Sequence, residues 1–164
     1  MGKVLKWAGI GLVVALALCQ LHRPERTNPP VDPAKRAEAH LQFTPEVSEI
    51  VAKGCRDCHT HETRWPWYSH VAPTSWLVVG DVNHAREHMN LSEWSEYDAV
   101  QVDKMLEEIC EEVEEGAMPL PIYTLIHREA DLTAQERQTV CDWTRAERQR
   151  LKSLEPRMNT DEHR

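Results

Sequence analysis

The usual sequence signals of β-strands are scarce in this chain of 164 residues. It has one Phe and three Tyr, and Val, Ile and Thr seldom alternate with polar residues as they do in half-buried strands. Helix-forming Glu, Ala, Leu, Arg and Gln are plentiful instead. The scarcity argues against a sheet-based fold and favours one small all-α domain, without internal repeats.

An excess of positive charge is also missing. The formal net charge is −8, from 19 basic and 27 acidic residues, and residues 1–23 contain three of the basic residues and no acid. The rest of the chain is therefore strongly acidic, which argues against nucleic acid as a partner. The charge would suit a basic protein partner, although solubility alone would explain it.

The chain also lacks a second pair of closely spaced cysteines. Cys55 and Cys58 stand three positions apart, whereas Cys110 and Cys141 stand alone. Structural zinc normally takes four Cys or His ligands, often from two such pairs. A thioredoxin-type redox pair needs a preceding strand, and here the preceding segment has a helical pattern. Both of these alternatives are therefore disfavoured.

The five residues Cys55-Arg56-Asp57-Cys58-His59 form the pattern Cys-x-x-Cys-His, which is typical of haem c attachment. Two thiols at this spacing reach the two vinyl groups of one porphyrin and form thioethers. His59 follows immediately and is placed to bind the iron through a ring nitrogen. We therefore expect one covalent haem c on Cys55 and Cys58, with His59 as an iron ligand.

A six-coordinate haem iron needs another axial ligand, and Met118 is the leading candidate. Pro119 follows it and would stiffen the loop that holds a weak thioether against the iron. Filling core space is the alternative role for a Met side chain. His127 is the best histidine alternative. The other candidates are His61, His70, His84, His88 and Met89.

Aromatic residues cluster soon after the haem-attachment motif. We expect Trp65, Trp67, Tyr68 and Trp76 to wall the haem, with indole N–H and phenol O–H groups reaching the propionates. Arg64 would pair with one propionate. Ordinary core packing, without any propionate contact, is the alternative for each of the aromatic residues.

The N-terminus has the pattern of a secretory signal or a membrane anchor. Lys3 and Lys6 precede an apolar run over residues 7–21. The run is at the short end of what spans a bilayer, and Ala15–Ala17 resembles a small-residue cleavage site. Because the apolar run continues past Ala17, we favour an uncleaved transmembrane helix within residues 1–23.

Helix start and stop signals divide the rest of the chain. Residues 24–43 read as a stiff Pro-rich tether, residues 44–154 as the haem domain, and residues 155–164 as a tail that frays. Helices are predicted to begin at four capping sites and, for the first and third, to end near Gly54 and Gly116. The four sites are Thr44-Pro45, Pro73-Thr74-Ser75, Ser92 and Thr133.

The two isolated cysteines, Cys110 and Cys141, each fall within a predicted helix. In an oxidising compartment they would form a disulfide that clips two helices together. Buried free thiols are the common alternative, and this second state is the one that we slightly favour.

Taken together, several motifs resemble a known family. Cys-x-x-Cys-His is followed by Trp65-Pro66-Trp67-Tyr68, Ala72-Pro73-Thr74-Ser75-Trp76, Leu91-Ser92-Glu93-Trp94 and Met118-Pro119-Leu120. This set, with Arg23-x-x-Arg26-x-Asn28-Pro29, resembles the bacterial haem-binding domain family of small, often membrane-anchored proteins with one haem c motif. The resemblance implies a cytochrome c-like helical domain wrapped around one covalent haem. Haem c attachment in turn implies that the domain faces the periplasm from the inner membrane.

Three functions remain open at this level. The first is single-electron transfer by a monohaem cytochrome c, which needs a redox partner protein and no catalytic base. The second is a peroxidase-like haem enzyme, which needs an open iron position and an acid–base residue. The third is a gas or redox sensor, in which Met118 would be a labile ligand. We expect electron transfer and no enzymatic activity, because His127 or His70 could serve as the acid–base residue only if Met118 does not bind the iron. The lack of a recognisable output domain argues against the sensor.

Overall fold

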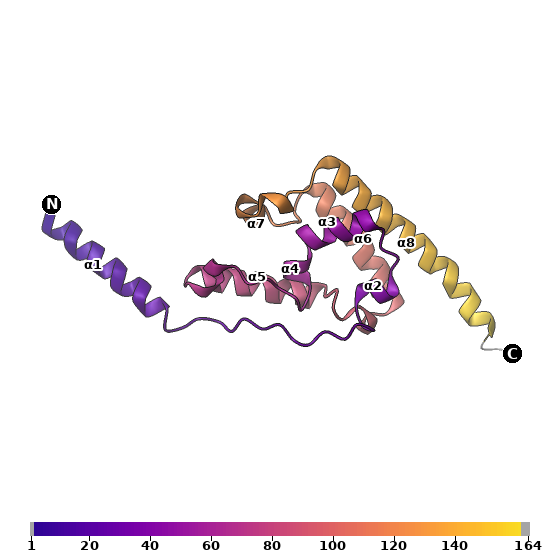
Figure 1. The fold of residues 1–164 in the computed structure, drawn as a ribbon, viewed down its shortest axis with the longest axis horizontal. Coiled ribbons are helices and arrows are strands. Elements are labelled where there is room, and N and C mark those ends of the chain that lie inside the picture. Colours follow the sequence, from indigo (N-terminus) through magenta and orange to yellow (C-terminus); the bar gives the residue numbers. More distant parts are fainter. Residues whose placement is uncertain (1, 162–164) are drawn as a thin grey trace.

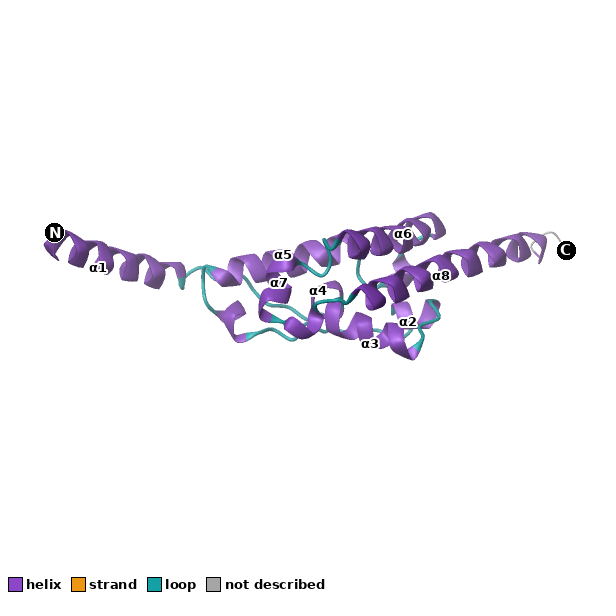
Figure 2. Cartoon of the chain, turned by 90° about the horizontal axis from the view of Figure 1, so that it is seen from above, coloured by secondary structure: helices purple, strands orange, loops and turns teal. Residues whose placement is uncertain are grey.

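The computed structural model describes residues 2–161, with side chains described as far as Leu154. Every regular element within that range is a helix, as the sequence predicts (Figures 1 and 2). The α-helices are α1 (Gly2–Cys19), α2 (Ala37–His40), α3 (Pro45–Gly54), α4 (Arg56–His59), α5 (Thr74–His88), α6 (Ala99–Glu115), α7 (Pro121–Ile126) and α8 (Ala134–Asp161). The 3₁₀ turns are η1 (Trp67–His70), η2 (Trp94–Glu96) and η3 (Arg128–Ala130).

Two of the predicted helix starts are confirmed in detail. The Thr44 side chain accepts a hydrogen bond from the Val47 N–H at 3.2 Å, and Pro45 opens α3. At the start of α8, Thr133 and Glu136 exchange hydrogen bonds as a capping box. These local signals fix where the two helices begin.

The predicted start of the third helix, at Ser92, is wrong. Residues near Ser92 form a turn and then η2, and α6 begins only at Ala99. Asp98 and Gln101 make the capping box there: each side chain accepts a hydrogen bond from the other residue's N–H, at 2.8 and 2.9 Å. The end is confirmed, because Gly116 has a φ of +72°, the left-handed conformation that favours glycine.

The core lies where α3, α6 and α8 pack together. One cluster of buried side chains joins Val47 and Val51 of α3 to Leu106 of α6 and Trp143 of α8. A second cluster contains Ile50, Cys110, Val113, Leu132, Val140 and Cys141. The long helices α6 and α8 thus form the frame on which α3 rests.

A disulfide joins Cys110 to Cys141 across this frame, with a Cα–Cα distance of 4.6 Å. The favoured expectation of two free thiols is therefore wrong. Spacing along the chain could not decide the matter, because only the packing of α6 against α8 brings the two cysteines into bonding range.

Two other segments differ from expectation. The predicted tether covers residues 24–43, but its second half belongs to the core, because Ala37 and Leu41 are buried in the first cluster. The outer end of α8 continues to Asp161 rather than fraying after Leu154, and residues 162–164 of the predicted tail lie outside the described part.

The apolar N-terminal run forms α1, which stands away from the rest of the domain (Figure 1). Its 18 residues have a mean hydropathy of 1.7 and none of them is buried. This is long and apolar enough for a membrane span or a signal sequence, as predicted.

Candidate functional site

The Cys-x-x-Cys-His motif begins at Cys55, between α3 and α4, and continues through α4. Helix α3 ends at Gly54, and the Cys55 N–H still donates to the Val51 carbonyl at 2.9 Å. The single turn of α4 then follows, in which the N–H groups of Cys58 and His59 donate to the Cys55 carbonyl at 3.2 and 2.9 Å. Residues three and four apart share one face of a helical turn. Both thiols and the imidazole therefore project from one short turn.

Both thiols of the motif are free and half-buried. Burial raises the pKa of the Cys58 thiol to about 11 and that of Cys55 to about 12. A redox-active dithiol needs a lowered thiol pKa instead. The local environment therefore does not favour thioredoxin-type chemistry at this pair.

The ring of His59 is fixed by a backbone acceptor. Its Nδ1 lies 3.0 Å from the Met89 carbonyl oxygen at the end of α5, so Nδ1 carries the proton and donates. Burial lowers the pKa of His59, which favours the neutral form of the imidazole. Metal-binding histidines commonly donate their second ring nitrogen in this way, which leaves Nε2 as the ligand atom. Met89, considered above as a ligand, thus contributes through its backbone.

Met118 lies close to the motif in space. Beyond Gly116, the Met118 N–H donates to the Glu112 carbonyl at 3.0 Å. The ring of the next residue, Pro119, is packed so tightly on Gly54 that a Cβ at position 54 would lie 3.1 Å from its Cγ. The half-buried Met118 side chain packs against the second core cluster. The segment that carries Met118 therefore abuts the residue before Cys55.

His127, the alternative sixth ligand, has both ring nitrogens engaged. Its Nε2 lies 2.7 Å from the Tyr68 hydroxyl, and its Nδ1 lies 3.4 Å from a Glu129 carboxylate oxygen. The ring also stacks on Tyr123, with the ring centroids 4.3 Å apart. Binding of iron through His127 would therefore require one of these two contacts to break.

A cleft of about 120 Å³ opens beside Cys58. Helices α5 and α7 form its walls, and apolar side chains dominate the lining. Three of them remain largely exposed: Leu77 by 62%, Ile122 by 61% and Ile126 by 62%. A larger hollow of about 480 Å³ between α6 and α8 contains none of the motif residues. The smaller cleft is therefore the candidate cofactor site, because its floor includes a thiol of the motif.

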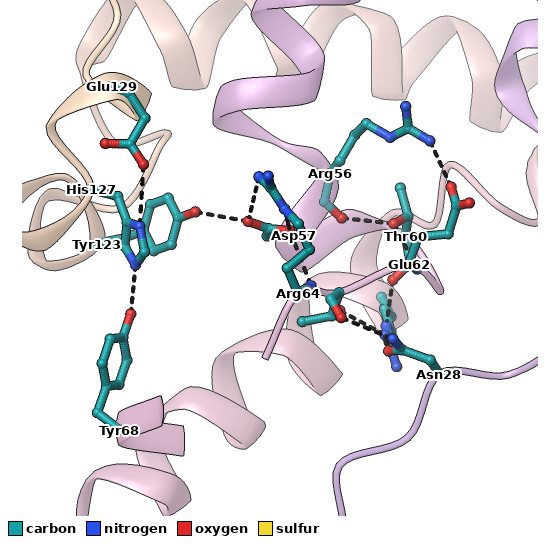
Figure 3. A network of polar contacts seen from close by, with 12 residues as sticks. Asn28, Arg56, Asp57, Thr60, Glu62, Arg64, Tyr68, Tyr123, His127 and Glu129 are labelled. Atoms are coloured by element: carbon teal, nitrogen blue, oxygen red, sulfur yellow. Dashed lines mark hydrogen bonds and ion pairs between the residues drawn. The ribbon is translucent and has the colours of Figure 1, made fainter. Parts of the chain in front are cut away.

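A polar network ties the motif to the far wall of this cleft (Figure 3). The Asp57 carboxylate accepts from Arg64 Nε and Nη2, both at 3.1 Å, and from the Tyr123 hydroxyl at 3.2 Å. Tyr123 stacks on His127, which is bonded to Tyr68. Burial raises the pKa of Tyr123, so its hydroxyl stays protonated and donates. The network holds α7 against both α4 and η1.

The predicted propionate donors occupy different environments. The Trp76 indole N–H donates to the His22 carbonyl at 2.7 Å, and the Arg64 guanidinium is bonded to Asp57. The Trp67 side chain is 77% exposed and does not line the cleft. Of these four groups, Trp65 therefore has a buried indole N–H without a partner among the described residues, but it is not part of the cleft lining.

The donor set has the chemistry that a haem c requires, because two thiols and an imidazole project from one turn beside an apolar cleft. Cys58 is the member of this set that lines the cleft of about 120 Å³, whereas Cys55, His59 and Met118 lie outside its lining. Sequence reasoning missed the Met89 carbonyl and the Asp57–Tyr123 contact. Asp57 lies inside the motif, but nothing in the sequence pairs it with a residue 66 positions away.

A comparison with known proteins adds one match. The family model described as a haem-binding domain matches residues 14–146. No curated protein and no solved structure shows significant similarity to the chain.

Proposed function

The chain belongs to the haem-binding domain family, and from that premise we propose that it holds one haem c covalently and carries single electrons. The observation that carries the proposal is the turn from Cys55 to His59. It presents both thiols together with an imidazole whose Nδ1 is already committed to the Met89 carbonyl. Haem alone would not require two thiols at this spacing, whereas thioether attachment does.

The roles of the chain's own residues follow from their places in the site. Cys55 and Cys58 would hold the haem through thioethers, and His59 would bind the iron through Nε2. Met118, on the segment that packs on Gly54, would supply a thioether as a further iron ligand. When bound, the haem iron supplies a one-electron couple, and a neutral thioether favours its reduced state.

Electron transfer is preferred here to enzymatic chemistry or sensing. A peroxidase-like enzyme or a gas sensor would need an open or labile sixth position, and an enzyme would also need an acid–base group above it. His127 lines the cleft and is the candidate for that role, but its Nε2 is hydrogen-bonded to the Tyr68 hydroxyl and its Nδ1 faces the Glu129 carboxylate. The acidic character of the chain supports exchange with a basic redox partner protein.

The same proposal includes a location. Helix α1 acts as an uncleaved anchor in the inner membrane, and the haem domain faces the periplasm, where haem c is attached. Its length and hydropathy support a span.

Covalent attachment is tested by denaturing the protein in acidic organic solvent after periplasmic expression with the haem-attachment machinery. We expect the pigment to stay with the parent protein, and we expect Cys58→Ser to weaken or abolish that retention. Cys19→Ser is the matched control, because Cys19 is the free cysteine outside the motif, and it should retain the pigment. Free extraction of the pigment from the parent protein would overturn the proposal.

A further inference from the structure

One exposed apolar surface is not explained by the haem cleft. Trp67, Val71 and Trp76 are exposed by 77%, 45% and 40%, and none of them lines the cleft beside Cys58. We call Trp67 of η1, Val71 just after η1 and Trp76 near the start of α5 the aromatic face. Aromatic side chains of this size are normally covered unless they serve an interface.

The aromatic face is joined to the end of α1 by hydrogen bonds. The Gln20 side chain donates to the Ala72 carbonyl at 2.8 Å and accepts from the Ala72 N–H at 3.0 Å. The Trp76 indole N–H donates to the His22 carbonyl at 2.7 Å. These bonds hold the face beside the point where α1 would leave the bilayer, and Figure 1 shows α1 extending from this side of the domain.

The charges around the face also suit a membrane surface. Residues 65–76 contain no acid, although the whole chain has 27 acidic residues. Arg23 and Arg26 lie alongside, bonded to the carbonyls of His70 and Ser69 at 2.9 and 3.0 Å. Trp is enriched at the membrane–water interface, and nearby Arg side chains are attracted to anionic headgroups.

We propose that the aromatic face rests in the headgroup region of the membrane that contains α1, so that the domain lies on the bilayer rather than swinging on its tether. This inference depends on the proposed anchoring role of α1. Interfacial apolar side chains typically lie about 5–10 Å into the boundary between headgroups and acyl chains. The occupant of the face is therefore lipid, rather than a second copy or a protein partner.

The test measures how fast a charged, water-soluble maleimide labels single cysteines in the full-length haem protein. The protein is placed at one copy per nanodisc containing anionic lipid, and Cys19→Ala removes the remaining free thiol. Val71→Cys reports on the aromatic face. Val100→Cys on α6 is the matched exposed control, because Val100 is 79% exposed. Leu12→Cys reports whether α1 lies in lipid.

We expect labelling at position 71 to be about tenfold slower than at position 100 or more, because a desolvated thiol whose pKa rises by one unit forms about a tenth as much thiolate. Exposure within the protein differs by less than twofold between the two sites, 45% against 79%, so protein burial alone would not produce that ratio. Trp67→Ser should lift the face out of lipid and speed labelling at position 71, whereas Leu154→Ser should not.

Other outcomes separate the possible failures. Rapid labelling at position 71 with slow labelling at position 12 would overturn the aromatic face as a lipid contact and leave α1 as the anchor. Rapid labelling at both positions would overturn the anchor and this inference together, while haem attachment is read independently from pigment retention. Protection at position 71 that appears only when two copies share one nanodisc would assign the face to a second copy and overturn the lipid proposal.

Discussion

Removing the Cys110–Cys141 disulfide tests how the helical frame supports the proposed iron site. We expect the double variant Cys110→Ala/Cys141→Ala to fold but to lose stability, because the disulfide no longer restricts the unfolded chain. The bond closes a sequence separation of 31 residues, for which the chain-entropy relation gives about 3.7 kcal/mol at 25 °C. The two lost sulfur contacts lie in a buried cluster and act in the same direction.

Removing the disulfide should also affect Met118, the proposed sixth ligand of the iron. Met118 packs against the cluster that contains both cysteines, so a looser cluster holds its thioether less firmly. We therefore expect the far-red sulfur–iron absorption band of the oxidised protein to weaken in the double variant. Urea unfolding in detergent micelles, followed by helical circular dichroism, measures the stability, and visible absorption measures the ligand.

Cys19→Ala is the control for this experiment, because it removes a cysteine outside the frame. It should leave both readings unchanged. If the double variant unfolds within about 1 kcal/mol of the parent, the disulfide does not act through loop closure as the entropic account requires. The double variant could instead lose the expected stability and keep the full sulfur–iron absorption band. That result would show that the packing of Pro119 on Gly54, rather than the buried cluster, holds Met118.

Three further predictions follow from named contacts. Met118→Ala should open the sixth position, so that carbon monoxide or cyanide binds readily by absorption titration, whereas ready binding by the parent would show that the ligand is wrong. Tyr123→Phe keeps the ring but removes the hydroxyl that donates to Asp57 at 3.2 Å. We expect the free energy of unfolding in urea to fall by about 1 kcal/mol and proteolysis near α7 to become faster; unchanged values would show that this hydrogen bond does not hold α7 in place. The hydrogen bond from Arg148 lowers the pKa of Asp103 to about 2, so the stability from this pair is present above about pH 4 and is lost as the pH falls through 2. Because the pair is partly exposed, Asp103→Asn should cost less than about 1 kcal/mol at pH 7, and its unfolding curve should converge with that of the parent near pH 2.

The sequence determined the features that depend on near neighbours along the chain. The all-helical class, the beginnings of α3 and α8, and the end of α6 follow from capping residues and from a glycine in the left-handed conformation. The pattern Cys-x-x-Cys-His belongs to the same group, because one helical turn suffices to place its side chains together. The start of α6 was mispredicted because Ser92 and Asp98 both suit a cap, and only Asp98 is paired with Gln101.

Contacts between distant segments were decided only in the tertiary structure. The packing of α6 on α8 brings Cys110 to Cys141, and the return of the chain after Gly116 brings Pro119 against Gly54. The backbone acceptor for His59 comes from Met89, 30 residues away. Local propensity carries no information about such pairs, because their approach depends on how whole helices pack around a shared core. The sequence therefore determined which groups are available for haem chemistry, and the packing decided which of them lie together.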